Sequence, residues 1–546
     1  MPPHATSASV LQKPLSTSPF QSTKPHVLIV GGGIGGLTLA ILLERARIPY
    51  TVLERSSHVR LLGSAIALGP GVLPLFEQIG LLEEIEQHSR PVNRGMVWSE
   101  KLVPIMDLDH TSSQKRYGFL TRVIGRPKLY QILLSHVPKE KIHLSKKVVS
   151  FTQSTTTTQP TTPSTHRPSP VLISCADGSQ FAGDILVGAD GAYSLTRHLL
   201  YQQMEDDYST AAKSLGAVRA EEIPSPFAPS SPLPASDKEL LSFTSTCLVG
   251  QTRPGLDLSK FKYVRGPDCK IGSIIGDNKP YSWSVFSMPD DSICWMVTEH
   301  LGESFTALPT SSPLPSRTSS PSPSGKVATT GTTASKSDET ESSYQWGVDK
   351  VDRMCEQVKD FPIPCGPGLK MSDLIQCTDR DKISKVMLEE KLFETWSYGR
   401  VVLLGDACHK LHPSAGLGAV AAIQDAAVLA DLLYHLPPSP SSYDITRVFK
   451  EYRECRYPIA QQSYETSYQM SHLNEQSWIS NFIRRAMNNL PKWIWYRVLD
   501  RMYEYRPQVS FLPSVKDRGE IPPLPESYPF VNSVDMHMGI DMSIDP

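Results

Sequence analysis

Three glycines at a fixed spacing form the stretch of this chain best suited to chemistry. Gly31, Gly33 and Gly36 fit the pattern G-x-G-x-x-G, and Glu54 follows 18 residues after the last of them. Such glycines allow a tight turn, a close backbone approach to a pyrophosphate, and close packing of a helix on a strand. A helix start offers N–H groups to phosphate oxygens, and a carboxylate after the next strand can accept hydrogen bonds from a ribose. The spacing therefore predicts a dinucleotide site.

Two later stretches end in residues that could contact the same ligand. An apolar run at 185–188 leads into Asp190-Gly191, and Ser194 can cap the short helix that carries Arg197. A second apolar run at 401–404 leads into Gly405-Asp406. A carboxylate at the end of a strand can bind a ribose or ribityl hydroxyl.

The segment after Asp406 contains Gly416 and Gly418 just before an apolar helix at 420–433. This is a second helix start that could face a ligand. His409 and His412 stand three residues apart in the same segment. The sequence shows no set of carboxylates or cysteines to complete a metal shell, so we predict no metal site.

Two weaker candidates lie between the first and second motifs. The small residues from Gly63 to Gly69 suit either a plain turn or a close approach to a bound ring. Arg126 stands where Pro127 indicates that a helix opens. An arginine at a helix start can hold a phosphate or the edge of a cofactor ring, although it is more often simply exposed.

Two kinds of element, strands and helices, must position these residues. Apolar runs at 27–30 and 50–53 predict buried parallel strands, and 37–47 predicts the helix between them. Between about 205 and 346 the pattern changes to short strands with turn signals, which predicts a mostly antiparallel lobe. The Thr/Ser/Pro-rich stretch 153–170 is interpreted as a long hairpin loop.

We therefore predict an α/β protein with an inserted lobe. The expected organisation is a disordered tail at 1–24, a nucleotide-binding domain at 25–204 and 347–435, a substrate lobe at 205–346 with disordered insertions near 224–236 and 308–342, and a helical region at 436–546. Trp493-Ile-Trp-Tyr496 in the last region could cover the core or touch a membrane surface.

Composition sets limits on function and location. A net charge of −2 gives no argument for nucleic-acid binding. Nine cysteines without a C-x-x-C pair indicate reduced thiols and a cytoplasmic protein. No run of about 18 apolar residues is present, so no membrane-spanning helix is expected. The sequence contains no signal of oligomeric state.

The three motifs in this order resemble the FAD-dependent monooxygenases of the para-hydroxybenzoate hydroxylase fold. The resemblance covers roughly residues 26 to 435, and Asp190-Gly-x-x-Ser194-x-x-Arg197 matches the family pattern at every fixed position. The chain is most similar to the fungal branch that epoxidises or hydroxylates terpenoids and indole-diterpenoids. Phe393-Glu-Thr-Trp-Ser-Tyr-Gly-Arg400 and Phe511-Leu-Pro resemble that branch too.

The resemblance implies FAD as cofactor, NADPH or NADH as reductant, O2 as co-substrate and a small apolar or aromatic substrate. Position by position, it places FAD contacts at Glu54, Gly63, Arg126, Asp406 and Ala419. Together with residues of the three motifs, the predicted cofactor-binding set is Gly31, Gly33, Gly36, Glu54, Gly63, Arg126, Asp190, Asp406, Gly418 and Ala419. Many relatives carry Gly-Gln-Gly-x-Asn where this chain has Leu417 and Val420 at the Gln and Asn positions. No catalytic acid or base is nominated.

Two other functions fit parts of this pattern. One is a flavin oxidoreductase without oxygen insertion, such as a prenyl reductase or halogenase of similar fold. The other is a non-catalytic flavin-binding protein, in which the Ser/Pro tracts would serve as docking segments.

Overall fold

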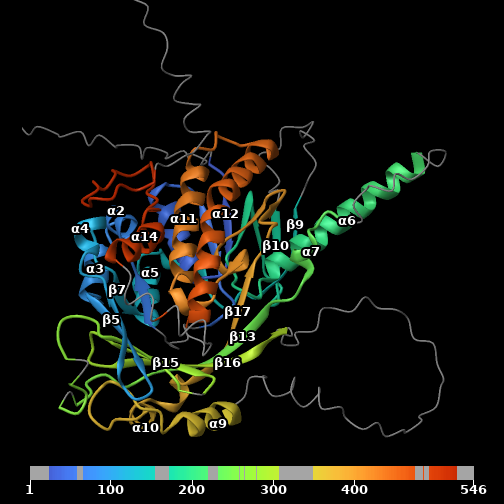
Figure 1. Cartoon of the computed structure of the whole chain (residues 1–546). Coiled ribbons are helices and arrows are strands. Elements are labelled where there is room, and N and C mark those ends of the chain that lie inside the picture. Colours follow the sequence, from blue (N-terminus) through green and yellow to red (C-terminus); the bar gives the residue numbers. More distant parts are fainter. Residues whose placement is uncertain are drawn as a thin grey trace, which may run out of the picture.

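The computed structural model describes residues 24–57, 65–153, 171–218, 231–306 (apart from 258, 263, 264 and 278), 348–473, 484 and 491–524. These residues form one six-stranded sheet, one eight-stranded sheet and two three-stranded sheets, with helices packed around them (Figure 1). Residues 1–23 of the predicted tail 1–24, residues 224–230 of the predicted insertion near 224–236, the insertion 308–342, the loop 154–170 and Gly63 lie outside the described residues. The described end of the first insertion leads into helix α7 (Ala235–Lys238), so the expected disorder was wrong there.

The predicted nucleotide-binding strands lie in the six-stranded sheet. Their order is β18 (Ser397–Tyr398), β19 (Val401–Leu403), β12 (Ile185–Gly188), β1 (Val27–Val30), β2 (Tyr50–Leu53) and β8 (Ile142–His143). All neighbours pair in parallel except β18 and β19. Because the carboxyl ends of parallel strands share one edge, the motifs after β1, β2, β12 and β19 meet there. The predicted Rossmann-like fold is confirmed.

Two central helices pack closely because small residues lie where they meet. Helix α1 (Ile34–Arg45) follows β1, and α11 (Gly418–Tyr434) packs against it. A Cβ atom added to Gly35 would stand 2.6 Å from Leu404 Cδ2 and 3.2 Å from Ala422 Cβ. A larger residue at position 35 would push the helices apart. Helices α1 and α11 contribute most of their side chains to the largest apolar core of the described chain.

Shorter elements complete the nucleotide-binding part. The small sheets contain β3 (Ala65–Leu68), β4 (Ser89–Pro91) and β7 (Arg122–Gly125), and β9 (Val148–Gln153), β10 (Val171–Cys175) and β11 (Gln180–Gly183). The helices here are α2 (Leu73–Gln78), α3 (Leu82–Gln87), α4 (Ser113–Tyr117), α5 (Arg126–Ser135), α6 (Leu195–Val218) and α7 (Ala235–Lys238). Val171 pairs with Gln153 in an antiparallel register, so the predicted hairpin strands are confirmed.

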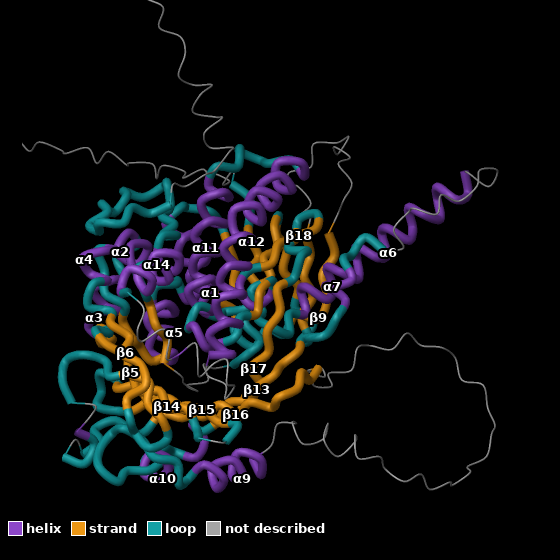
Figure 2. Tube along the Cα trace, in the orientation of Figure 1, coloured by secondary structure: helices purple, strands orange, loops and turns teal. Residues whose placement is uncertain are grey.

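The eight-stranded sheet forms the second part. Its order is β20 (His409–Lys410), β17 (Ser384–Leu392), β13 (Ser242–Gln251), β16 (Ile293–Thr306), β15 (Tyr281–Ser287), β14 (Ile271–Ile275), β5 (Arg94–Ser99) and β6 (Pro104–Asp109). Only β14 and β5 pair in parallel within this sheet, which agrees with the predicted antiparallel lobe. The sheet nevertheless takes strands from residues 94–109 and 384–410, outside the expected lobe range (Figure 2).

The two faces of this sheet differ in burial. One face carries Trp283, Trp295 and Val297, which pack with α9 (Val348–Val358) and α10 (Met371–Gln376) in a separate core. The opposite face is half-buried along β15 and β16, at Ser282, Ser284, Met296, Thr298 and His300. At one end of this half-buried face, the Ala65 N–H donates to Cys294 Sγ, so the face turns toward β3 of the nucleotide-binding part.

Two helices and an extended segment form the described C-terminal region. Helix α12 (Ser442–Leu473) packs against α11, and α14 (Lys492–Tyr503) follows. Residues 505–524 then run without a helix, which differs from the helical region expected at 436–546. Trp493 of the expected aromatic cover is 63% exposed. Within the described ranges, no helix is both long and apolar enough to cross a membrane.

Candidate functional site

The three glycines of the first motif have different surroundings. Gly31 has a φ of +108°, and a Cβ atom there would lie 2.3 Å from the Ala189 carbonyl oxygen. A Cβ at Gly36 would lie 2.1 Å from the Gly31 oxygen. These two glycines therefore permit the turn and the packing of α1. Gly33 caps α1, and no described atom lies within 4 Å of its Cβ position, which leaves space for a ligand at the helix start.

Glu54 lies beside this turn, as predicted from its position after β2. One carboxylate oxygen accepts the Gly32 N–H at 2.8 Å, and the other accepts the Ser56 N–H at 2.8 Å. These bonds fix the carboxylate at the edge of the glycine turn. Each oxygen keeps a further lone pair, so Glu54 can still accept a hydrogen bond from a hydroxyl.

The polar side chains of the second motif bind the start of the helix that follows and the loop of the third motif. Asp190 accepts hydrogen bonds from the backbone and the hydroxyl of Thr196, both at 3.0 Å, and Ser194 Oγ accepts the Arg197 N–H at 2.9 Å. The predicted cap by Ser194 is thus confirmed. The buried Arg197 guanidinium donates to the carbonyls of Ala192 and Ala407 at 2.8 and 2.9 Å.

Arg197 therefore joins the second motif to the third, because Ala407 directly follows Asp406. Its side chain also lies over the Phe393 ring, 4.0 Å from the centroid. The carboxylate of Asp190 accepts hydrogen bonds from Thr196, at the start of α6. A direct contact of Asp190 with the cofactor stays a prediction.

Asp406 lies in the short helix η4 (Gly405–Ala407), one turn from Lys410, whose Nζ is 2.9 Å from the carboxylate. This proximity raises the pKa of Lys410, while the nearby charge of Arg126 acts in the opposite direction. Arg126 is exposed at the first position of α5, as predicted. Glu54 and Arg126 both act on the pKa of Tyr130, which burial raises, so the two predicted residues share one neighbourhood.

The start of α11 closes the same edge. The short helix η5 (Pro413–Ala415) ends at Gly416, whose φ is +66°. Gly418 begins α11, and no described atom lies within 4 Å of its Cβ position. A Cβ at Gly416 would lie 3.8 Å from Ala67 Cβ, so this loop and β3 lie close together. Of the small residues 63–69, which were predicted to approach a bound ring, at least those of β3 therefore lie next to the start of α11.

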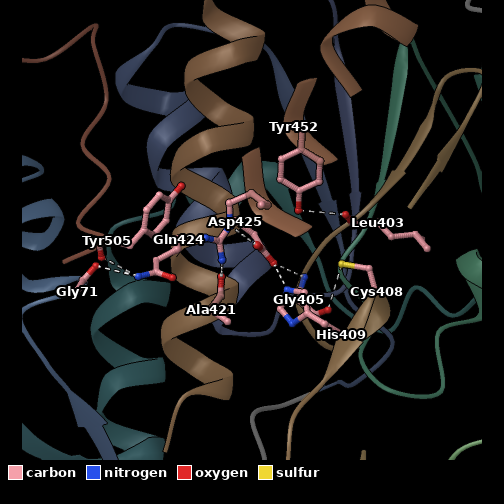
Figure 3. A network of polar contacts seen from close by, with 11 residues as sticks. Gly71, Leu403, Gly405, Cys408, His409, Ala421, Gln424, Asp425, Tyr452 and Tyr505 are labelled. Atoms are coloured by element: carbon pink, nitrogen blue, oxygen red, sulfur yellow. Dashed lines mark hydrogen bonds and ion pairs between the residues drawn. The ribbon is translucent and has the colours of Figure 1, made fainter. Parts of the chain in front are cut away.

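Sequence reasoning missed a buried polar network centred on Asp425 of α11 (Figure 3). Its carboxylate accepts the Gly405 N–H at 3.0 Å, His409 Nε2 at 2.6 Å and Arg456 Nε at 2.7 Å. Burial alone would raise the pKa of Asp425, but His409 and Arg456 lower it to about 2. The signal in the sequence was the carboxylate of Asp425, buried with Gln424 and Asp431 in the mostly apolar helix 420–433.

This network connects the Gly405-Asp406 loop to the C-terminal region. Arg456 belongs to α12 and lies over the ring of Tyr505, 5.0 Å from its centroid. Gln424, next to Asp425, donates to the carbonyls of Gly71 and Tyr505 at 3.3 and 3.2 Å (Figure 3). The loop that carries Asp406 is therefore held from behind by α11, α12 and the segment after α14.

Three possible metal ligands meet in this network, contrary to the reasoning from sequence. Cys408, His409 and Asp425 each place a ligand atom within 4.8 Å of the others, and all three are buried. The Asp425 carboxylate, however, already accepts from the guanidinium of Arg456. A fixed cation beside the only carboxylate of this group disfavours a second cation, so we interpret the group as an ion network.

Comparison with known sequences gives relatives of similar length. The chain is 27% identical over 516 residues to the FAD-dependent monooxygenase ausM of Emericella nidulans, which covers 92% of this chain and 90% of the relative. It is 28% identical over 455 residues to the FAD-dependent monooxygenase ptmM of Penicillium ochrochloron, covering 81% and 87%. The FAD-dependent monooxygenase paxM of Penicillium paxilli is 27% identical, covering 81% and 77%.

Solved structures share the fold. Klebsiella pneumoniae HpxO in complex with FAD and uric acid aligns with a TM-score of 0.60 at 16% identity, over 88% of this chain and 96% of that one. The 2,6-dihydroxypyridine-3-hydroxylase of Arthrobacter nicotinovorans aligns with a TM-score of 0.55 at 14% identity, over 83% and 94%.

A family model described as an FAD binding domain matches residues 24–239 and 371–466, more than half of the chain. The protein therefore belongs to this family of FAD-binding proteins. The predicted resemblance to fungal FAD-dependent monooxygenases, and with it the assignment as an oxidoreductase that uses FAD, is confirmed.

Proposed function

We propose that this protein uses NADPH or NADH and O2 to hydroxylate or epoxidise a small apolar or aromatic molecule. The observation that carries the proposal is the convergence of the three motifs at one edge of the six-stranded sheet, beside strand β3, which contacts the half-buried face of the eight-stranded sheet. The names of the fungal relatives support monooxygenation over the two alternatives from sequence.

The described residues fit FAD. The open Cβ positions at Gly33 and Gly418 mark two helix starts without a capping side chain, which suits phosphate and ring oxygens. Glu54 and Asp406 are carboxylates at strand ends and would hold ribose and ribityl hydroxyls. When bound, FAD supplies the electron transfer and oxygen activation that no side chain can provide.

The protein residues have supporting tasks in this reaction. The Asp425 network holds the Gly405-Asp406 loop in place, and Arg197 ties that loop to the second motif. The half-buried face of the eight-stranded sheet provides a wall against which a substrate can lie. Burial of this space excludes water from the reacting atoms.

Leu417 and Val420 replace polar residues common in relatives, and Val420 is buried where α11 meets the C-terminal region. Val420 Cγ1 would stand 3.8 Å from a Cβ at Gly71. The side chain is thus turned toward the N-terminal part of the chain and α12. We infer that backbone N–H groups at the start of α11, rather than these side chains, contact the ring.

An anaerobic absorbance titration with NADPH and then NADH tests the proposal. The purified holoprotein is expected to be yellow and to bleach with at least one nucleotide, and air with a substrate is expected to restore the colour and release an oxygenated product. A protein that takes up no FAD would contradict the central claim. Bound flavin that neither nucleotide bleaches would favour the non-catalytic alternative, and bleaching without oxygenated product would favour the reductase alternative.

A further inference from the structure

His412 carries a buried nitrogen that forms no hydrogen bond with any described residue. The side chain is 3% exposed and stands between β20 and η5. The backbone N–H of Ser414 donates to Nδ1 at 3.3 Å, and the Ser414 hydroxyl lies 2.5 Å from the same atom. Nε2 has no hydrogen-bond partner among the described residues.

The Ser414 contacts fix the tautomer of this ring. A backbone N–H can only donate, so Nδ1 accepts and the proton of the neutral ring sits on Nε2. Burial, together with His300, Lys410 and His472, lowers the pKa of His412 to about 4. At neutral pH the ring therefore presents one N–H group that is buried without an acceptor. Such a group costs about 1–3 kcal/mol unless something else accepts its hydrogen.

The surroundings of His412 point toward the half-buried sheet face. His300, which perturbs the pKa of His412, lies on that face of β16. Its own nitrogens are engaged, Nδ1 with Ser245 Oγ at 3.3 Å and Nε2 with Ser282 Oγ at 3.0 Å. His300 is thus held in place by Ser245 of β13 and Ser282 of β15. It places a polar side chain on the half-buried face near His412.

A second buried atom without a described partner lies in the same region. Glu390 of β17 is 9% exposed, and its Oε2 has no partner among the described residues. His472 acts electrostatically on both Glu390 and His412, so the two groups share a neighbourhood. The other end of the half-buried face is apolar, where Cys294 and Met288 pack with residues of β3 and β7.

His412, His300 and Glu390 therefore lie toward one end of the half-buried face, and apolar residues lie at the other end. We propose that His412 donates its Nε2–H to an oxygen atom of the substrate, so that the enzyme selects apolar molecules that carry a hydroxyl or carbonyl group. This inference rests on the proposed function, because it assigns the substrate to the space in front of η5. It makes His412 a specificity residue rather than a proton donor in the reaction.

Matched ligand pairs test this inference on the oxidised, FAD-loaded full chain. Ferruginol is compared with its deoxy counterpart abietatriene, and camphor with bornane, by titration of the flavin absorbance. The wild type is expected to bind at least one oxygenated member about tenfold more tightly than its hydrocarbon, which is the effect of one hydrogen bond in a buried site. His412→Phe is expected to abolish that preference without weakening hydrocarbon binding.

Three further variants sharpen the test. His412→Gln keeps an N–H donor and is expected to retain part of the preference. Ser414→Ala removes the hydroxyl beside Nδ1 and is expected to reduce the preference, with a smaller risk to folding. His136→Phe alters a partly exposed histidine that contacts Glu84 elsewhere, and it should behave as the wild type.

Each result decides the inference. Equal preference in the wild type and in His412→Phe would overturn it, as would a wild type that prefers neither oxygenated member. If His412→Phe does not fold, His412→Leu, which also lacks a donor, takes its place, and an unchanged preference in that variant would overturn the inference. These titrations need neither NADPH nor O2, so failure of nucleotide bleaching would contradict only the proposed monooxygenase activity and leave the binding preference to be judged separately.

Discussion

Replacing Arg456 by Met should destabilise the protein strongly, because it leaves the buried Asp425 carboxylate without one of the two side chains, Arg456 and His409, that offset its burial. Both side chains are fully buried, and Arg456 Nε lies 2.7 Å from the carboxylate. Removal of one partner from a buried ion pair typically costs about 3–5 kcal/mol. The pKa of Asp425, lowered to about 2 by His409 and Arg456 together, agrees in direction with a stabilising role of this ion pair.

The pH dependence of this effect has a definite sign. The folded-state pKa of Asp425 lies below its unfolded value, so its stabilisation is present above about pH 4 and is lost as the pH falls toward 2. Without Arg456, one of the two groups that lower the pKa of Asp425 is gone, so the folded-state pKa of this carboxyl is higher in the variant than in the wild type. As the pH falls, the carboxylate of the variant is therefore protonated before that of the wild type. The difference in stability between wild type and variant should narrow as the pH falls from 7 toward 2.

Urea denaturation of the FAD-loaded protein, followed by tryptophan fluorescence, measures this difference. The control Lys141→Met breaks a partly exposed pair with Glu44 and should cost less than about 1 kcal/mol. A double variant, Asp425→Leu with Arg456→Met, should be less destabilised than Arg456→Met alone, because neither charge remains buried. A cost of Arg456→Met no larger than that of the surface control would refute the reasoning, as would a double variant whose cost equals the sum of the single ones.

Three other predictions concern the cofactor site and the thiols. Gly31→Ala should abolish FAD binding or folding, because its Cβ would lie 2.3 Å from the Ala189 oxygen at a φ of +108°; a soluble variant with the wild-type flavin content would contradict this. Asp406→Asn should weaken FAD binding about tenfold, measured by flavin fluorescence, since one charged hydrogen bond is lost; an unchanged Kd would exclude Asp406 from the site. In a thiol titration of the native protein, no more than three of the nine cysteines should react quickly, the half-buried Cys355, Cys377 and Cys455. Burial raises the pKa of Cys247 and Cys294 to about 12, so fast reaction of more than three thiols in the folded protein would contradict the structure.

The sequence by itself determined the local parts of this protein. The turn at Gly31, the cap by Ser194 and the positions of Glu54 and Asp406 after strands depend on residues close in the chain, and short-range patterns predict such features reliably. The antiparallel character of the lobe followed from its strand and turn signals. Its extent did not, because β5 and β17 join the sheet from segments far apart in the chain.

Only the tertiary structure decided how the motifs are supported. Asp425 and Arg456 are 31 residues apart and lie on different helices, so no sequence period links them. Cys408, His409 and Asp425 came together in the same way, although no set of carboxylates or cysteines was expected to complete a metal shell around His409. The surroundings of His412 depend on His300 of β16 and His472 of α12. The burial of a residue and the identity of its partners depend on packing between distant segments, and the local sequence pattern does not determine that packing.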